Sequence, residues 1–236
     1  MQGLSGKTIL IASGPTFAPL DAVRSITNHS SGRLGSEIGY QLHKAGADVV
    51  FLAGETSVTP KDLYADNTLE PMKLHRFRTV PDLKELLRTY LIRQPVDAVI
   101  MAAAVLDYLP AETAMNKQPS NQDEWVITLK RGEKLIERIH TWNPSIAIVG
   151  FKLESGMTRQ ALLEKAVDLM NRSGAVLVIG NQIETVDADH HAACIFQRDT
   201  PDGNVLVSAE YTTKREIAQA LTAHLIQYFQ TAKETT

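Results

Sequence analysis

Residues 7–54 read KTILIASGPTFAPLDAVRSITNHSSGRLGSEIGYQLHKAGADVVFLAG and contain two kinds of periodic segment. Residues 7–14 and 47–54 are short apolar runs that each end in glycine, which is typical of strands buried in a parallel sheet. Between them, residues 34–46 carry leucine and isoleucine at helical spacing and end in Gly46, a typical helix C-cap residue. Strand, helix and strand in this order predict a βαβ unit, and hence an α/β fold.

The same alternation continues along the chain and predicts one doubly wound, Rossmann-like α/β domain with a parallel sheet over residues 1–236. Further strands are expected at residues 73–79, 97–105, 145–155 and 175–181. Further helices are expected at residues 80–94, 133–142, 158–174 and 213–229. Near the end, residues 192–197 and 204–210 flank a Pro-Asp-Gly turn, so they predict a C-terminal antiparallel hairpin.

One segment departs from this alternation. Residues 106–131, after the fourth strand, are polar and contain Pro110 and Pro119 before the strand-like residues 124–130. A long excursion inside a compact domain is usually functional. We therefore expect an inserted arm that belongs to the site or reaches a partner.

The composition excludes several classes of protein. The chain of 236 residues is 44% hydrophobic with a formal net charge of −3, so a basic nucleic-acid-binding surface is not expected. Its single cysteine, Cys194, excludes an internal disulfide and a cysteine-based zinc site, and it suits a reducing cytoplasm. No apolar run approaches the ~20 residues that span a bilayer. We expect a cytoplasmic protein that acts on small molecules, with no nucleic acid or membrane partner.

Small residues follow the predicted strands at their carboxyl ends, where open α/β sheets bind ligands. These ends are residues 13–16, 53–56, 102–108, 150–155 and 180–182. Glycine, alanine, serine and asparagine there allow backbone N–H groups to approach a ligand closely, as phosphate binding requires. The pattern predicts a nucleotide or another phosphate ligand, although such residues also form tight turns and close packing.

A dinucleotide-dependent oxidoreductase is one alternative. Its fingerprint, G-x-G-x-x-G, follows the first strand directly, whereas here residues 15–28 precede the serine- and glycine-rich run. Glu55, at the end of the second strand, stands where a ribose-binding acid is expected, so a nicotinamide- or flavin-dependent enzyme stays open. A non-catalytic nucleotide-binding module is a third interpretation.

Four motifs resemble those of a known family: residues 9–54, DAVIMAAAVLDYLPA (97–111) with Lys117 behind it, IVGFKLES (148–155) and VIGN (178–181). With them the chain resembles phosphopantothenate–cysteine ligase, also called phosphopantothenoylcysteine synthetase, from about residue 7 to the final helix. The most specific part runs from Gly14 to Gly35. The resemblance implies the stand-alone bacterial type, without the fused flavin-dependent decarboxylase domain.

The resemblance also implies a reaction of coenzyme A biosynthesis. The family activates the carboxylate of 4′-phosphopantothenate with a nucleoside triphosphate, CTP or else ATP. An acyl-nucleotide forms while pyrophosphate leaves with Mg²⁺, and the amine of L-cysteine then attacks the acyl carbon and releases the nucleoside monophosphate. Mg²⁺ would be held mainly by the phosphates, so no protein metal ligands are expected. A homodimer is implied, in which the arm of one chain reaches the site of the other.

By the resemblance, Asn28 and Lys117 are catalytic. The Asn28 amide offers neutral donors to oxygens on which negative charge develops, and the alternative is that Asn28 caps the helix after it. Lys117 would close over the phosphates, whereas a lysine on a loop is usually only solvated. The nucleotide is expected at Gly14, Ser30, Gly32, Gly35, Ala102, Ala103, Asp107, Phe151 and Asn181, and the substrate phosphate at Arg24 and Ser31.

Three segments depart from the family pattern. The lysine-rich run expected around Lys117 is reduced to MNKQP, and MNRSG, in which only Arg172 is charged, replaces the lysines expected before the last parallel strand. The RGEKLIE loop, residues 131–137, also differs, so the choice between CTP and ATP stays open. His190 and His191 show no metal spacing, and we expect them on opposite faces of a strand or solvated in a loop.

Overall fold

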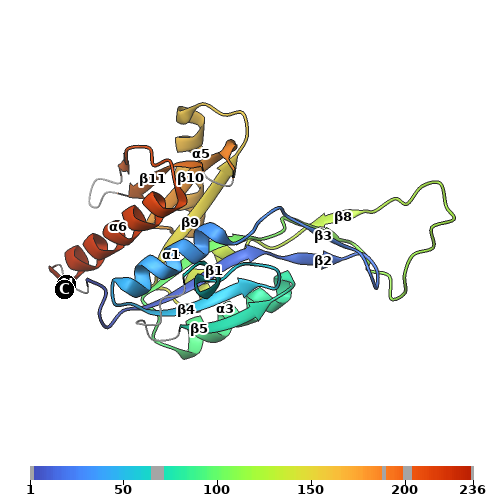
Figure 1. The fold of residues 1–236 in the computed structure, drawn as a ribbon, viewed down its shortest axis with the longest axis horizontal. Coiled ribbons are helices and arrows are strands. Elements are labelled where there is room, and N and C mark those ends of the chain that lie inside the picture. Colours follow the sequence, from blue (N-terminus) through green and yellow to red (C-terminus); the bar gives the residue numbers. More distant parts are fainter. Residues whose placement is uncertain (1–2, 65–71, 188–189, 199–203, 235–236) are drawn as a thin grey trace.

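The computed structural model describes residues 3–64, 72–187, 190–198 and 204–234, which form a central sheet, its covering helices and a projecting arm (Figure 1). Among these residues, an eight-stranded sheet has the order β12-β11-β10-β9-β6-β1-β4-β5. The strands are β1 Thr8–Pro15, β4 Asp48–Gly54, β5 Lys73–Phe77, β6 Ala98–Ala104, β9 Ala147–Glu154, β10 Leu177–Val186, β11 His191–Arg198 and β12 Val205–Val207. All neighbours from β5 to β10 are parallel, whereas β11 and β12 pair antiparallel. The predicted doubly wound fold and its antiparallel end are confirmed.

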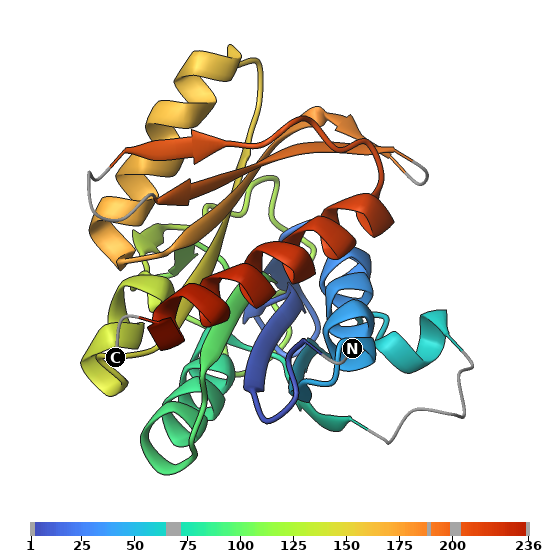
Figure 2. The same ribbon diagram turned by 90° about the vertical axis from the view of Figure 1, so that its left-hand side faces the viewer.

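Helices cover both faces of the sheet. On one face lie α1 (Arg33–Lys44) and α6 (Lys214–Glu234), which contact each other, with the single-turn α2 (Pro60–Leu63) beside α1 (Figure 2). The other face carries α3 (Val80–Arg93), the 3-10 turn η1 (Leu135–Arg138), α4 (Ile139–Trp142) and α5 (Arg159–Ser173). Within the described ranges, no helix has the length and apolar character needed to cross a membrane.

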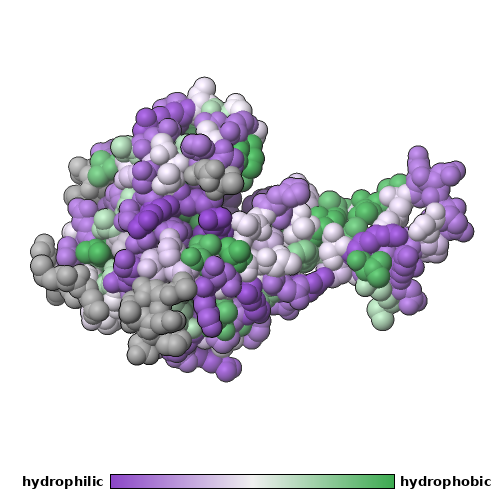
Figure 3. All heavy atoms as spheres, viewed as in Figure 1, coloured by the Kyte–Doolittle hydropathy of each residue, from purple (hydrophilic) through white to green (hydrophobic). Residues whose placement is uncertain are grey.

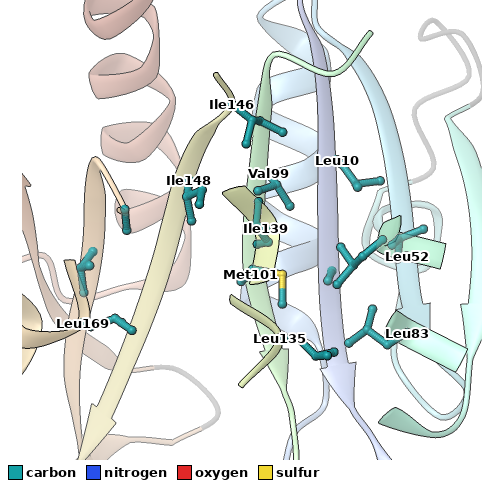
Figure 4. Packing of buried hydrophobic residues seen from close by; sticks show 14 of the residues in the cluster. Leu10, Leu52, Leu83, Val99, Met101, Leu135, Ile139, Ile146, Ile148 and Leu169 are labelled. Carbon is teal, nitrogen blue, oxygen red and sulfur yellow. The ribbon is translucent and has the colours of Figure 1, made fainter. Parts of the chain in front are cut away.

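The core has two layers because β1 lies inside the sheet and its side chains alternate between the two faces. Leu10 and Ala12 belong to the layer under α3 and α5, where Leu83 also packs (Figure 4). Ile9 and Ile11 belong to the layer under α1 and α6. Burial on both faces explains why the first strand is a continuous apolar run rather than an alternating one.

Three predicted elements are much shorter than expected, among them the hairpin strand predicted at residues 204–210, which is only Val205–Val207 (β12). The helix predicted at residues 133–142 is only a 3-10 turn followed by one α-helical turn, and it stops before Pro144, which forces Asn143 into an extended conformation. The strand predicted at residues 124–130 is wrong for most of its length, because pairing is confined to Leu129–Arg131 (β8) opposite Tyr108–Pro110 (β7). The predicted Pro-Asp-Gly turn lies mostly outside the described residues.

The arm is built from two segments that are far apart in the sequence. A short hairpin, β2 (Phe17–Pro19) and β3 (Ser25–Thr27), lies within the insertion after β1 and was not predicted. The backbone N–H of Ala114 donates to Leu20 O at 2.9 Å, and that of Gln118 donates to the Asp21 carboxylate at 3.0 Å. These bonds fasten residues 106–131 to the hairpin, and both project from the body as one arm (Figures 1 and 3).

Candidate active site

A cavity of about 930 Å³ lies at the carboxyl ends of β6, β9 and β10, beside the start of α1. The following predicted site residues line it: Asn28, Ser30, Ser31, Gly32, Gly35, Ala102, Ala103, Asp107, Phe151 and Asn181. The structure therefore brings together residues from four separate segments of the chain, three of which follow predicted strands. The strand ends at residues 13–16, with the predicted nucleotide contact Gly14, and at residues 53–56 do not line the cavity.

The loop before α1 leaves the helix N-terminus open toward this cavity. Gly32 is the N-cap with a φ of 73°, and α1 has neither a side-chain cap bond nor an acidic residue in its first turn. Ser13 Oγ donates to Gly32 O at 3.0 Å and so holds the loop on β1. Gly14 lies behind the loop with a φ of 90°, where Ser57 leaves no room for a side chain. The backbone N–H groups of Gly32 and Arg33 donate to the Ser30 and Ser31 hydroxyls, both at the long distance of 3.4 Å. The backbone N–H groups of a helix N-terminus and the helix dipole suit an anionic ligand.

Asn28 does not cap α1. Its amide nitrogen Nδ2 instead donates to the carbonyl oxygens of Ala104 and Val105, at 3.3 and 3.4 Å. Asn28 thereby joins the end of the insertion to the end of β6 while its side chain remains exposed at the cavity wall. The capping alternative is wrong, because the cap position belongs to Gly32.

Charged side chains line the cavity along residues 133–137 and α5. Lys134 Nζ lies 2.5 Å from the carboxylate of Asp107, the predicted nucleotide contact. The two side chains form an ion pair. Arg172 pairs with Glu137 at 2.5 Å and with Asp168 at 3.0 Å. The sequence analysis did not single out Lys134, and its only signal was the unusual RGEKLIE loop. Lys134 and Arg172 bring cationic groups, each paired with a carboxylate, to the cavity. The arm itself has few lysines.

The β10–β11 end of the cavity holds His191, which the sequence analysis placed either on a strand face or solvated in a loop. The loop alternative is wrong for His191, which opens β11 and is only 8% exposed. His190 is exposed and lies 3.2 Å from the Asp187 carboxylate. Burial, together with the positive charge of Lys214, lowers the pKa of His191 from an ordinary value of 6.5 to about 4. The His191 imidazole is therefore neutral at neutral pH.

Arg24 and Lys117 lie on the arm and not among the residues that line the cavity. The Arg24 guanidinium is 3.4 Å from the buried Asp21 carboxylate, and it stacks on Trp125 at 5.0 Å from the ring centroid. Lys117 is exposed. Within one chain, the two predicted phosphate-binding cations are therefore separate from the other site residues.

Comparison with known proteins identifies the family. The model of the DNA/pantothenate metabolism flavoprotein C-terminal domain family matches residues 4–229. The chain belongs to this family. The chain is 30% identical over 220 residues to the coenzyme A biosynthesis bifunctional protein CoaBC of Thermococcus kodakarensis, covering 93% of this chain and 51% of that protein. The chain thus spans about half the length of this relative.

Two solved structures are similar in fold to this chain. The DNA/pantothenate metabolism flavoprotein from Streptococcus pneumoniae matches it with a TM-score of 0.80 and 27% identity, over 94% of this chain and 100% of that chain. The Cab2 mutant H337A in complex with phosphopantothenate-cysteine has a TM-score of 0.73 and 22% identity, covering 98% and 89%. The second likeness bears on the fold alone.

Proposed function

We propose that this chain is a phosphopantothenate–cysteine ligase, which joins 4′-phosphopantothenate and L-cysteine through an acyl-nucleotide intermediate in coenzyme A biosynthesis. The observation that carries the proposal is the open N-terminus of α1 beside the Asn28 amide in one cavity. Family membership supports it, as does the coenzyme A role in the name of the Thermococcus relative.

In the first half-reaction, the carboxylate of phosphopantothenate attacks the α-phosphorus of a nucleoside triphosphate, and pyrophosphate leaves. The N–H groups at the start of α1 and the hydroxyls of Ser30 and Ser31 bind phosphate oxygens in this proposal. Asp107 and Phe151, at two other strand ends, contact the nucleoside. We propose CTP as the co-substrate.

In the second half-reaction, the cysteine amine attacks the acyl carbon of the acyl-nucleotide, and the nucleoside monophosphate leaves. In this proposal the Asn28 amide exchanges one of its long bonds to Ala104 O and Val105 O for a bond to the oxygen on which negative charge develops. An amide suits this role because it is a neutral donor that does not titrate. A carboxylate in its place would instead repel the neighbouring phosphates.

Mg²⁺ belongs to this proposal as an ion carried by the phosphates. The described part of the chain has no group of three or more His, Cys, Asp or Glu side chains that could hold a metal ion. Mg²⁺ bound to nucleotide phosphates generally keeps several waters and takes only one or two protein carboxylates. When bound, Mg²⁺ neutralises negative charge on the triphosphate and the departing pyrophosphate.

We also propose a homodimer in which the arm of one chain completes the cavity of the other. The arm carries exposed apolar side chains, a feature typical of an interface: Val23, Tyr108, Met115, Trp125, Val126, Ile127 and Leu129 (Figure 3). In this arrangement Arg24 and Lys117 of one chain reach the Asn28 cavity of the partner subunit and bind phosphates there.

Mixed dimers test this arrangement. Asn28→Asp and Lys117→Gln chains are each expected to be nearly inactive, but co-expression unites an intact cavity with an intact arm in one of the two sites of each mixed dimer. About one quarter of all sites should then be active, given random pairing of the two chains. Activity no higher than that of the separate variants, or a fully active monomer in sedimentation, would contradict the dimer.

Pyrophosphate release from CTP, Mg²⁺ and phosphopantothenate, with and without cysteine, tests the ligase. Thermal stabilisation by CTP with Mg²⁺ but not by NADPH or FMN separates it from an oxidoreductase. Glu55 gives that alternative little support, because its carboxylate is paired with Arg78. A chain that binds CTP but releases no pyrophosphate would be a nucleotide-binding module.

Asn28→Asp separates the two half-reactions. We expect acyl-nucleotide to accumulate on this variant in the presence of cysteine, because activation survives while amide formation fails. Asn143→Asp is the matched control, since Asn143 lies outside the cavity and hydrogen-bonds only locally with Ser145. Product formation by Asn28→Asp at the wild-type rate would remove Asn28 from the mechanism.

A further inference from the structure

His191 is buried at the cavity wall without hydrogen-bond partners for its ring. Neither Nδ1 nor Nε2 has a partner among the described residues, although the residue is only 8% exposed and lines the cavity. Ser57 Oγ is the other such atom in the described ranges, and it lies behind the α1 loop and outside the cavity lining. Buried polar atoms are nearly always paired, so the His191 ring points to a group that binds in the cavity.

An irregularity in the pairing of β10 with β11 positions His191 at the cavity wall. β10 and β11 pair in regular register up to Asn181 opposite Ala193, and the register then shifts so that Val186 faces His191. The backbone N–H of His191 donates to Thr212 O at 2.8 Å, which ties β11 to the residues before α6. Lys214, the first residue of α6, therefore reaches the same end of the cavity.

The groups at this end carry both signs of charge. Lys214 lines the cavity while its ammonium donates to Asp187 O at 2.8 Å, and Asp187 lines it too. Lys152 pairs with Glu154 at 2.6 Å. The first turn of α1, in contrast, contains no acidic residue. Mixed charge suits a zwitterion, whereas a polyphosphate would meet repulsion from Asp187.

The hydrogen-bonding groups of the His191 imidazole also favour an amino acid over a polyphosphate as the ligand at this end of the cavity. A neutral imidazole has one donor and one acceptor nitrogen. Phosphate oxygens accept hydrogen bonds, so a polyphosphate would leave the acceptor nitrogen unpaired. An α-amino acid offers an amine as donor and a carboxylate as acceptor in one small molecule. The apolar side chains of Leu153, Ile183 and Val186 complete this end of the cavity, and they suit a soft CH₂–SH group.

We propose that His191 and Lys214 bind the amino and carboxylate groups of L-cysteine at the β10–β11 end of the cavity, an assignment that rests on the proposed ligase function. Lys214 pairs with the carboxylate. The acceptor nitrogen of His191 receives a hydrogen bond from the amine and orients it toward the acyl-nucleotide. The nucleoside triphosphate and phosphopantothenate occupy the α1, β6 and β9 parts of the cavity.

The test measures each half-reaction in His191→Leu and Lys214→Met variants of the full chain. Pyrophosphate release with CTP and phosphopantothenate alone should stay within about twofold of wild type, because neither side chain contacts these substrates. The KM for cysteine should rise by about 10- to 100-fold, the usual range for losing a buried polar contact to a substrate. His191→Gln, which keeps a donor and an acceptor, should recover part of the loss.

His190→Leu is the matched control, because the neighbouring histidine is exposed and does not line the cavity. The melting temperature supplies a second readout: His191→Leu should equal or exceed wild type, because it removes two unpaired buried nitrogens. An unchanged KM for cysteine, or a raised KM for CTP, would overturn the assignment. A wild-type chain that releases no pyrophosphate would instead refute the ligase itself, and cysteine as the ligand with it.

Discussion

Replacing Gly35 with alanine should impair the cavity more than the fold. Gly35 lies in the first turn of α1, directly against β1, and an added β-carbon would lie 2.6 Å from Ser13 Cβ. Carbon atoms pack best at about 3.5–4.0 Å, so the start of α1 must move away from β1 by about 1 Å. This part of the helix lines the site, and a displacement of about 1 Å can cost about 10²-fold in rate.

The stability change is smaller because two effects oppose each other. Overpacking costs about 1–3 kcal/mol, whereas alanine is about 1 kcal/mol better than glycine inside a helix. The net loss of about 0–2 kcal/mol corresponds to a melting temperature lower by at most about 8 °C for a chain of this size. Calorimetry and pyrophosphate release measure the two effects separately.

Gly39→Ala provides the matched control on the same helix. Gly39 faces the core, where an added β-carbon would lie 3.1 Å from Phe51, so a comparable loss of stability should leave the rate near wild type. The double variant Ser13→Gly/Gly35→Ala should recover only part of the activity, since it removes the opposing side chain but also the hydrogen bond from Ser13 to Gly32 O. A Gly35→Ala chain with the wild-type rate and a raised melting temperature would show that α1 and β1 are not in tight contact.

Three further predictions concern the histidine at the cavity wall and the arm. Because the pKa of His191 is about 4 when folded and 6.5 ordinarily, the unfolded chain binds the proton first, and stability should fall between about pH 6.5 and 4. The shift is worth at most about 3 kcal/mol, and about 1 after solvent screening; denaturant titration of wild type and His191→Leu should differ by this amount, and identical pH profiles would contradict it. Lys117→Gln should slow pyrophosphate release about 10²-fold with stability within about 0.5 kcal/mol, and an unchanged rate would show that the lysine is only solvated. Asp21→Ala should expose the arm to limited proteolysis while CTP binding persists, because the Asp21 carboxylate accepts the backbone N–H groups of Val23, Arg24 and Gln118; an unaltered cleavage pattern would be inconsistent with that anchor.

The sequence by itself determined the order of the elements and three of the strand ends that line the cavity. Apolar runs such as residues 7–14 and 97–105 can be buried on both faces only in a parallel sheet, and the carboxyl ends of parallel strands meet at one edge. The small residues after parallel strands, including Ala102 and Asn181, consequently met where the pattern predicted. These patterns can be recognised in the sequence because each lies within one strand or one helix.

Only the tertiary structure decided the features that depend on contacts between distant segments. The strand predicted at residues 124–130 was cut short because its partner β7 has only three residues. Asn28 does not cap α1, because Gly32 occupies the cap position and the Asn28 side chain donates to a carbonyl oxygen at the end of β6. His191 was buried beside a register shift between β10 and β11, and the hairpin that carries Arg24 became part of the arm. Pairing partners, register and burial are set by the free energy of the whole packed chain, and no local pattern encodes them.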